Sequence, residues 1–146
     1  MAGVNKEARR EARIAALQIL YTIEQNPDAT LLGILESSKG SEELVISSVE
    51  VRDYTKSLVK EVLGRKESID TLLSKYTRNW TIERLSSIDR NLLRLAVAEL
   101  QGEFKTPLRV VINEAVEIAK MFGTDDSAKF VNGVIDAVKN EIEYTE

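Results

Sequence analysis

The chain has 146 residues, of which 43% are hydrophobic and 30% charged, and its net charge is -4. This composition favours one globular domain with a single core and excludes a disordered chain. The sequence has no cysteine and no histidine, which excludes disulfides and thiolate metal sites and removes the commonest general base. No apolar run approaches the roughly 20 residues that span a bilayer, and no apolar signal region follows the N-terminus. We therefore expect a cytoplasmic protein that is not an enzyme and has neither cofactor nor metal.

The first expected helix begins at Asn5, a suitable N-cap, and ends before Pro27. Its apolar stripe belongs to its second half, whereas its first turns are rich in basic residues. This basic start has two interpretations. It is either a solvated helix start that forms exposed ion pairs with Glu7 and Glu11, or a positive end that projects from the body and offers guanidinium groups to phosphates. The basic residues are Lys6, Arg9, Arg10 and Arg13.

The middle of the chain predicts short helices separated by polar segments. Thr30 is placed to cap a short helix, and residues 37–47 form a polar loop. Ser48 then begins a longer helix with an apolar side. Gly64 and the charged residues after it indicate a break, so we expect two helices between Ser48 and Tyr76. The apolar side is formed by Val51, Tyr54, Leu58 and Val62.

The second half of the chain predicts three further helical segments. Trp80 is expected to fill a helix junction, and Thr81 opens a short turn before a helix with an apolar stripe. Thr106 and Pro107 form a cap followed by a proline at the first helical position, and this helix runs to Gly123. The last helix is apolar at Phe130, Val134, Val138 and Ile142.

No segment alternates convincingly with the period of two that is typical of a strand. The sequence therefore predicts an all-α fold of about seven helices in one domain over residues 1–146. We expect two small helical bundles that divide near the connection from Gln101 to Pro107. The corresponding sub-bundles are roughly residues 1–100 and 101–146.

The stretch FGTDDSAKFVNGVID, residues 122–136, departs from helix preferences twice. Lys129 is a positive charge near a helix N-terminus, which favours negative ones, and Gly133 lies in a helix interior. Lys129 makes sense there if the helix N–H groups and the ammonium together face an anion. Gly133 most simply permits close packing against a neighbour. Three residues could cap this helix: Asp125, Asp126 and Ser127.

No catalytic constellation is evident in the sequence. Glu114 and Glu117 lie one helical turn apart, but without histidine partners they indicate a solvated face. The ligand spacing of a calcium loop is absent, and the dispersed glycines form no phosphate-binding loop. Tyr21 and Phe130 are candidate rings for base stacking, although the pattern favours a core position for Phe130 and leaves Tyr21 open.

Four blocks of the sequence together resemble the NusB family of bacterial transcription antitermination factors. They occur in the family's order and leave residues 22–79 weakly matched. The blocks are ARREARIAALQILY, W-x3-R-L-S-x2-D-R-N-L-L-R-L-A-x2-E-L from Trp80, P-x3-V-I-N-E-A-V-E-I-A-K from Pro107, and F-G-T-D-D-S-x-K-F-V-N-G-V-I-D from Phe122.

The resemblance implies an all-helical fold of two bundles and a partner, the small-subunit ribosomal protein NusE. It implies that this heterodimer binds the single-stranded boxA element of nascent ribosomal RNA transcripts. The assembly then helps RNA polymerase to read through terminators. Carried over by motif position, the implied RNA contacts are Arg9, Arg10, Arg13, Tyr21, Arg94, Asp126, Ser127, Lys129 and Phe130. The implied NusE contacts are Glu83 and Asp89.

Two departures from the family pattern qualify this assignment. Ala128 stands where many members have histidine, so any contact of that ring is lost. Glu11 interrupts what is often a longer arginine run, so we expect weak RNA binding without the partner. Asp126 competes with an RNA anion for the helix end, so Asp126→Asn should tighten binding modestly.

Two other functions fit the same residues. The chain is alternatively a non-catalytic protein-interaction adaptor with an incidental cationic tip, or the RNA-targeting module of an rRNA methyltransferase. The second is disfavoured because no catalytic domain follows residue 146. A homodimer that covers the RNA surface, as some family members form, stays open.

Overall fold

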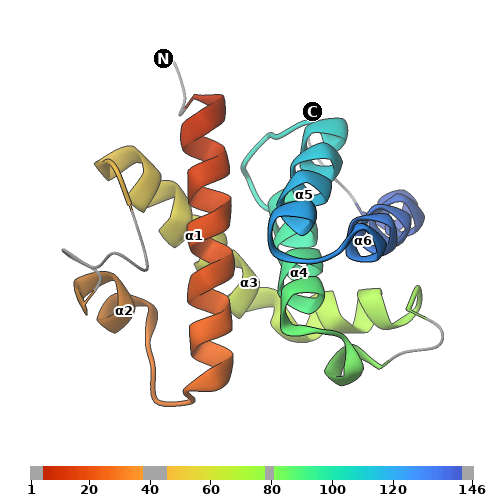
Figure 1. Ribbon diagram of the computed structural model, residues 1–146, viewed down its shortest axis with the longest axis horizontal. Helices are drawn as coiled ribbons and strands as arrows, with labels where there is room; N and C mark the ends of the chain where they lie inside the picture. The colour runs from red at the N-terminus through yellow and green to blue at the C-terminus, as the bar shows by residue number, and fades with distance from the viewer. Residues whose placement is uncertain (1–4, 38–45, 78–80, 143–146) are drawn as a thin grey trace. The chain divides into compact units, whose positions relative to one another are not determined.

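The computed structural model describes residues 5–37, 46–77 and 81–142, and these residues contain helices and no strand. The all-α prediction is confirmed, and the predicted number of about seven helices is close to the six α-helices and two short 3₁₀-helices found (Figure 1). Trp80 and most of the predicted polar loop lie outside the described residues. The helices are α1 (Lys6–Gln25), α2 (Leu31–Ser37), α3 (Val49–Ser74), η1 (Ile82–Arg84), α4 (Ser87–Gln101), α5 (Leu108–Phe122), α6 (Asp125–Val138) and η2 (Lys139–Glu141).

The chain divides into two compact units, Met1–Lys60 and Glu61–Glu146, so α3 contributes a half to each. This differs from the expected division near residues 101–107. The connection there is a tight reversal, in which the Gly102 N–H donates to the carbonyl of Ala98 and Lys105 takes a positive φ of 57°. It packs α4 against α5 and so joins these helices in one unit.

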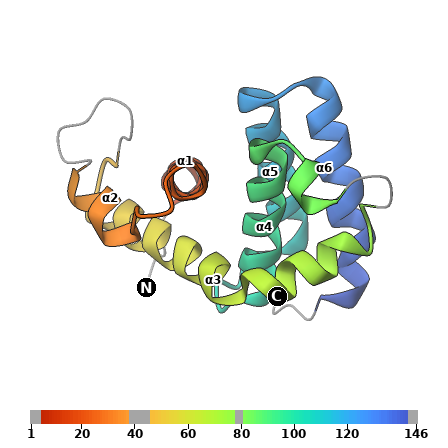
Figure 2. The same cartoon turned by 90° about the horizontal axis from the view of Figure 1, so that it is seen from below.

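The first unit contains α1, α2 and the first half of α3, with α1 crossing α3 (Figure 2). Two predicted N-caps are confirmed: Asn5 Oδ1 accepts from the Ala8 N–H at 2.8 Å, and Thr30 Oγ1 accepts from the Gly33 N–H at 3.0 Å. The predicted cap at Thr106 is wrong, because α5 begins at Leu108 and Pro107 takes the N-cap position. Burial in α1 begins at Ala12, which agrees with an apolar stripe in its second half. The largest buried side chains of this unit are Leu17, Ile19, Leu35, Val51 and Leu58.

The second unit contains a bundle of α4, α5 and α6, in which each helix packs against the other two. Ser86 caps α4 by accepting a hydrogen bond from the Asp89 N–H at 3.1 Å. Every residue of α4 from Asn91 to Leu100 is buried, polar residues included. The largest buried side chains of this unit are Ile69, Leu73, Leu92, Leu93, Leu100, Ile118 and Ile135.

The predicted helix break at Gly64 is wrong, because α3 is one unbroken helix of 26 residues that includes Gly64. Glycine costs only about 1 kcal/mol relative to alanine in a helix interior. Val62 and Ile69 on either side of it are buried, so packing favours helix on both sides of the glycine. A single unfavourable residue is therefore outweighed by tertiary contacts.

Candidate nucleic-acid interface

The predicted RNA-binding residues lie on α1 in the first unit and on α4 and α6 in the second. On α1, Arg9 and Arg10 are half-buried, and Tyr21 is 45% exposed. Arg13 is only 6% exposed. The Arg13 side chain therefore presents little surface to a ligand, and its contact with RNA stays a prediction.

The start of α1 is attached to the start of α3. The guanidinium of Arg9 lies over the ring of Tyr54, with its Cζ 5.3 Å from the ring centroid. The Nε of Arg9 is buried and has no hydrogen-bond partner among the described residues. This geometry is a cation–π interaction, and it orients the arginine without occupying that donor.

Two hydrogen-bonded contacts lie beside this pair. The carboxylate of Glu11 accepts from the Ser47 N–H at 2.7 Å and from the Ser47 hydroxyl at 2.8 Å. The hydroxyl of Thr55 donates to the carbonyl of Ala12 at 3.4 Å. The expected projection of the basic end away from the body is therefore wrong. Glu11 also binds the segment that precedes α3, in contrast to the expected exposed ion pairs within α1.

The start of α6 carries the second group of predicted residues. Thr124 is its N-cap, since Thr124 Oγ1 accepts from the Ser127 N–H at 3.1 Å. The prediction that Asp125, Asp126 or Ser127 caps this helix is therefore wrong, because the helix begins one residue earlier. Asp126 and Lys129 are exposed.

The remaining residues of this helix start divide between two faces. Ser127 and Phe130 are half-buried, so both keep an accessible edge. Ala128 is 4% exposed and belongs to the face that packs inward. A Cβ placed on Gly133 would meet no atom within 4 Å, so the prediction that Gly133 permits close packing is wrong.

Arg94 forms an ion pair with Asp70 in the interior of the second unit. Its Nε and one terminal nitrogen each donate to the Asp70 carboxylate at 2.8 Å, and the other terminal nitrogen donates to Asn91 at 3.2 Å. The Arg94 side chain is 6% exposed. Asp70 lies on α3 and Arg94 on α4, so the pair joins these helices within the second unit. Three of its donors bind inside the protein, and the expected contact of Arg94 with RNA stays a prediction.

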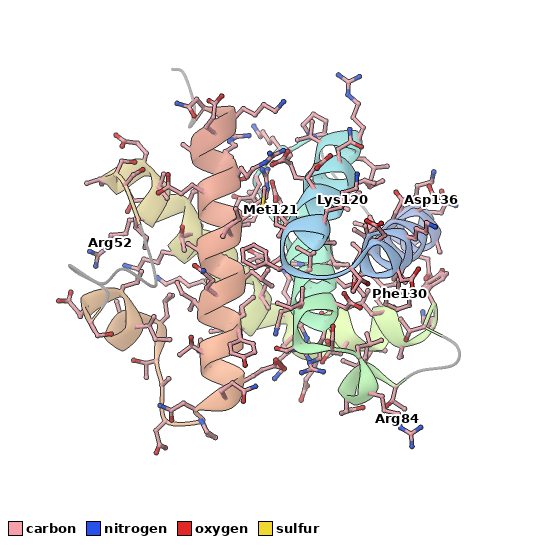
Figure 3. All side chains as sticks on the ribbon, in the orientation of Figure 1. Arg52, Arg84, Lys120, Met121, Phe130 and Asp136 are labelled. Carbon is pink, nitrogen blue, oxygen red and sulfur yellow. The ribbon has the colours of Figure 1, made fainter. Side chains whose placement is uncertain are left out.

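The two predicted partner contacts lie at η1 and at the start of α4. Glu83 is exposed, whereas Asp89 is half-buried and its Oδ1 has no hydrogen-bond partner among the described residues. Arg90 fixes the η1 turn by donating to the Leu85 carbonyl at 2.6 Å and to the Ile82 carbonyl at 3.2 Å. Glu83 is therefore presented on a turn that is tied to α4, next to Arg84, which extends away from the ribbon (Figure 3).

Two features of this region differ from the sequence prediction: the contact of Tyr54 with Arg9 and the exposure of two apolar residues at the end of α5. The apolar pattern predicts Tyr54 on a buried side, and the signal that points to Arg9 is an aromatic residue opposite a run of arginines. Met121 is 53% exposed and Phe122 is 42% exposed, directly before α6. Their position after Lys120, at the end of the apolar stripe, gave no sequence signal of exposure (Figure 3).

The described parts of the chain contain no group of three or more acidic side chains able to hold a metal ion. None of the helices in the same residues is long and apolar enough to span a bilayer. The fold and the candidate site define a class of small all-α domains in which the first helix begins with several basic residues.

The model of the NusB family matches residues 10–140. The chain belongs to the NusB family, which confirms the resemblance seen in the four sequence blocks. The transcription antitermination protein NusB of Chloroherpeton thalassium (strain ATCC 35110 / GB-78) is 37% identical over 138 residues, which cover 92% of this chain. The match spans 63% of the length of that relative.

Two solved structures are similar over nearly the whole chain. NusB of T. maritima matches with a TM-score of 0.80 and 37% identity, covering 92% of each chain. A crystal structure of the antitermination factors NusB and NusE in complex with dsRNA matches with a TM-score of 0.81 and 28% identity. That match covers 94% of this chain and 99% of the other.

Proposed function

We propose that this protein is a non-enzymatic transcription antitermination factor that works in the cytoplasm. With the ribosomal protein NusE it binds single-stranded boxA RNA of nascent ribosomal RNA transcripts, and the assembly promotes read-through by RNA polymerase. The observation that carries this proposal is the family match over residues 10–140. The similarity to a NusB that was crystallised with NusE and RNA supports the same partners here.

The start of α1 supplies the cationic part of the proposed RNA site. Arg9 and Arg10 are half-buried, so their stems are ordered while their charged groups can reach phosphates. Tyr21 offers an exposed ring on the same helix. Stacking of a base on such a ring contributes about 1–3 kcal/mol.

The start of α6 supplies a second cationic contact. Lys129 is exposed close to the helix N-terminus, where N–H groups and the helix dipole also favour an anion. Ser127 and Phe130 flank it with a hydroxyl and a ring that are both half-buried. These groups suit a phosphate and an adjacent base.

Binding of fluorescently labelled boxA RNA tests the proposal, with a scrambled oligomer and a duplex of the same sequence as controls. With NusE present, we expect boxA to bind more tightly than either control. The affinity should fall with salt by a log–log slope of about -0.7 for each phosphate contacted on a single strand. Equal affinity for boxA and the scrambled oligomer would contradict the proposed function and favour a protein-interaction adaptor.

Glu83 tests the partner surface separately from RNA. We propose that Glu83 and Asp89 contact NusE. Glu83→Lys should weaken NusE binding in calorimetry, while Glu103→Lys, an exposed charge reversal in the turn after α4, should not. The matched control separates a local contact from the general effect of reducing the negative charge.

Asp126 tests the electrostatics of the α6 start. Because Thr124 caps the helix, Asp126→Asn removes a charge without removing the cap hydrogen bond. We expect RNA affinity to rise by about twofold, which corresponds to the lower range of helix-terminus charge effects. A clear loss of affinity would show instead that the carboxylate makes a needed contact.

A further inference from the structure

The Arg9–Tyr54 pair forms a cation–π interaction that lies within the proposed RNA site. The 5.3 Å separation is within the roughly 6 Å over which a ring attracts a guanidinium. Tyr54 is half-buried in the first part of α3, and the neighbouring Thr55 bonds to the α1 backbone. The ring is therefore fixed on a helix that is itself attached to α1.

A ring and a carboxylate hold arginine in different ways. A carboxylate uses the guanidinium N–H groups, as Asp70 does with Arg94. A ring attracts the guanidinium plane electrostatically and uses none of the donors at its edge. The contact with Tyr54 thus reduces the rotamer freedom of Arg9 before RNA arrives and occupies neither terminal nitrogen, whereas the buried Nε is out of reach of a phosphate.

We propose that Tyr54 is a positioning residue of the RNA site, which acts by holding the Arg9 guanidinium ready to bind a backbone phosphate. This inference rests on the proposed function. It assigns a role in RNA binding to the first part of α3, a region in which the sequence matches the family blocks weakly. Tyr54 itself need not touch RNA, because its effect passes through Arg9.

Four variants test this proposal by boxA titration in the presence of NusE: Tyr54→Leu, Tyr54→Phe, Arg9→Ala and the double variant Arg9→Ala/Tyr54→Leu. We expect Tyr54→Leu to weaken binding about fivefold, in the range of a partly desolvated cation–π pair. Tyr54→Phe keeps the ring and should stay within about twofold of the wild type. In the Arg9→Ala background, Tyr54→Leu should have no further effect, because its target is gone.

A second measurement follows the pair in the protein without RNA. The Nε–H resonance of Arg9 should be shifted by the Tyr54 ring current, retained in Tyr54→Phe and lost in Tyr54→Leu. Circular dichroism melts establish that each variant is folded at the titration temperature. If a folded Tyr54→Leu loses the ring-current shift and binds boxA as the wild type does, the positioning role is overturned.

The remaining outcomes separate the two proposals. If the wild type prefers boxA over the scrambled oligomer and Tyr54→Leu weakens binding equally with and without Arg9, Tyr54 acts by another route and this inference fails alone. If the wild type shows no preference for boxA, the proposed function fails and the inference fails with it. A salt slope that is smaller in Tyr54→Leu than in the wild type supports a lost phosphate contact.

Discussion

Arg9 and Arg94 each contact a side chain of α3, but the two contacts differ in chemistry and in burial. Arg94 meets the carboxylate of Asp70 in the second unit and is buried. Arg9 meets the ring of Tyr54 in the first unit and is half-buried, with an unpartnered Nε. The side chain that an arginine contacts, and not its presence in one of the four sequence blocks, decides how many of its guanidinium donors remain available for a ligand.

The difference also has an energetic side. A buried guanidinium is stable only when its donors are matched, because an uncompensated buried charge costs several kcal/mol. Arg94 meets that requirement with two hydrogen bonds to Asp70 and one to Asn91. Arg9 meets it only in part, because its side chain is partly exposed but its buried Nε has no hydrogen-bond partner among the described residues.

The largest expected effect is that of Arg94→Ala, which breaks the interior pair. It leaves Asp70 without its partner, and the Asp70 side chain is 26% exposed, so water relieves only part of the penalty. We expect the free energy of unfolding to fall by about 3 kcal/mol, at the lower end of the range for broken buried pairs. Urea denaturation monitored by circular dichroism measures this change.

The double variant Arg94→Met/Asp70→Leu is the matched control for that experiment. Replacing both members of a buried pair with apolar residues of similar size is often nearly neutral, so stability should return close to that of the wild type. If Arg94→Ala left stability unchanged and lowered RNA affinity, the contrast between the two arginines would be lost. Arg94 would then be an RNA contact after all.

Much of the fold could be predicted from the sequence, because it depends on local signals. The cap at Asn5, the apolar stripe of α1 and the absence of strands from the described residues follow from residue types at short spacing. The unbroken α3 was not predictable in the same way. Whether Gly64 ends a helix depends on the burial of Val62 and Ile69, which is a tertiary property.

The candidate site could be predicted from the sequence only in part, for the same reason. Exposure of Tyr21 and Lys129 was compatible with the sequence pattern, but the pairing of Arg94 with Asp70 joins residues 24 positions apart. The contact between Arg9 and Tyr54 spans an even larger separation. No local pattern distinguishes an arginine that will find a carboxylate from one that will find a ring.

Glu11→Gln is expected to have the next largest effect on stability. It tests the contact between Glu11 at the start of α1 and Ser47. The carboxylate that binds Ser47 twice becomes a neutral amide, which retains one acceptor and weakens these charge-assisted bonds. Stability should fall by about 1 kcal/mol. RNA affinity at low salt should rise by about two- to threefold, because one negative charge leaves the cationic site.

Thermal melting and boxA titration of the same Glu11→Gln sample measure both effects. The two changes have opposite signs, so they identify Glu11 as a residue that stabilises the fold at some cost in RNA binding. A fall in affinity together with stability would show that the Ser47 contact is needed to shape the RNA site. Glu50→Gln, a neutralisation of an exposed residue in the first turn of α3, serves as the control for charge alone.

Gly64→Ala tests the helix that carries both arginine partners, with a smaller expected effect. A Cβ at Gly64 meets no atom within 4 Å, and the same is true of Gly133 in α6. Each alanine substitution should therefore raise the free energy of unfolding by about 0.5–1 kcal/mol. The contrasting variant is Gly102→Ala, whose Cβ would lie 2.6 Å from the ring of Phe104 and should lower it.

Differential scanning calorimetry ranks the three glycine variants. If Gly64→Ala destabilised the protein while Gly133→Ala stabilised it, α3 would need flexibility at Gly64, and the two arginine partners would not sit on one continuous helix. Equal stabilisation supports a continuous α3.

The smallest expected effect concerns a carboxylate that is held on the surface, in contrast to the interior Asp70. Glu141 in η2 accepts a hydrogen bond from the Tyr76 hydroxyl, and Lys75 Nζ lies 3.4 Å from its other oxygen. The Tyr76 hydrogen bond is the main cause that lowers the pKa of Glu141, partial desolvation opposes it, and Lys75 adds to the lowering. The same bond raises the pKa of Tyr76.

The sign of the pH dependence follows from these directions. Since the pKa of Glu141 is lowered in the folded state, its stabilisation is present above the ordinary glutamate value of about 4.3 and is lost as the pH falls through the lowered pKa. Since the pKa of Tyr76 is raised, its contribution is lost as the pH rises through that raised value, above about 10. The contact therefore stabilises the end of the chain between these limits, including neutral pH.

Tyr76→Phe tests this contact by removing the donor while keeping the ring. Carboxyl carbon NMR titration should show the pKa of Glu141 moving up toward its ordinary value, and the acid side of the Tm against pH curve should become flatter. Lys75→Met should shift the pKa in the same direction by less, because the hydrogen bond from Tyr76 is the larger cause. If Lys75→Met had the greater effect, charge attraction would hold Glu141, and the surface contact would resemble the interior pair of Arg94 more than the present geometry indicates.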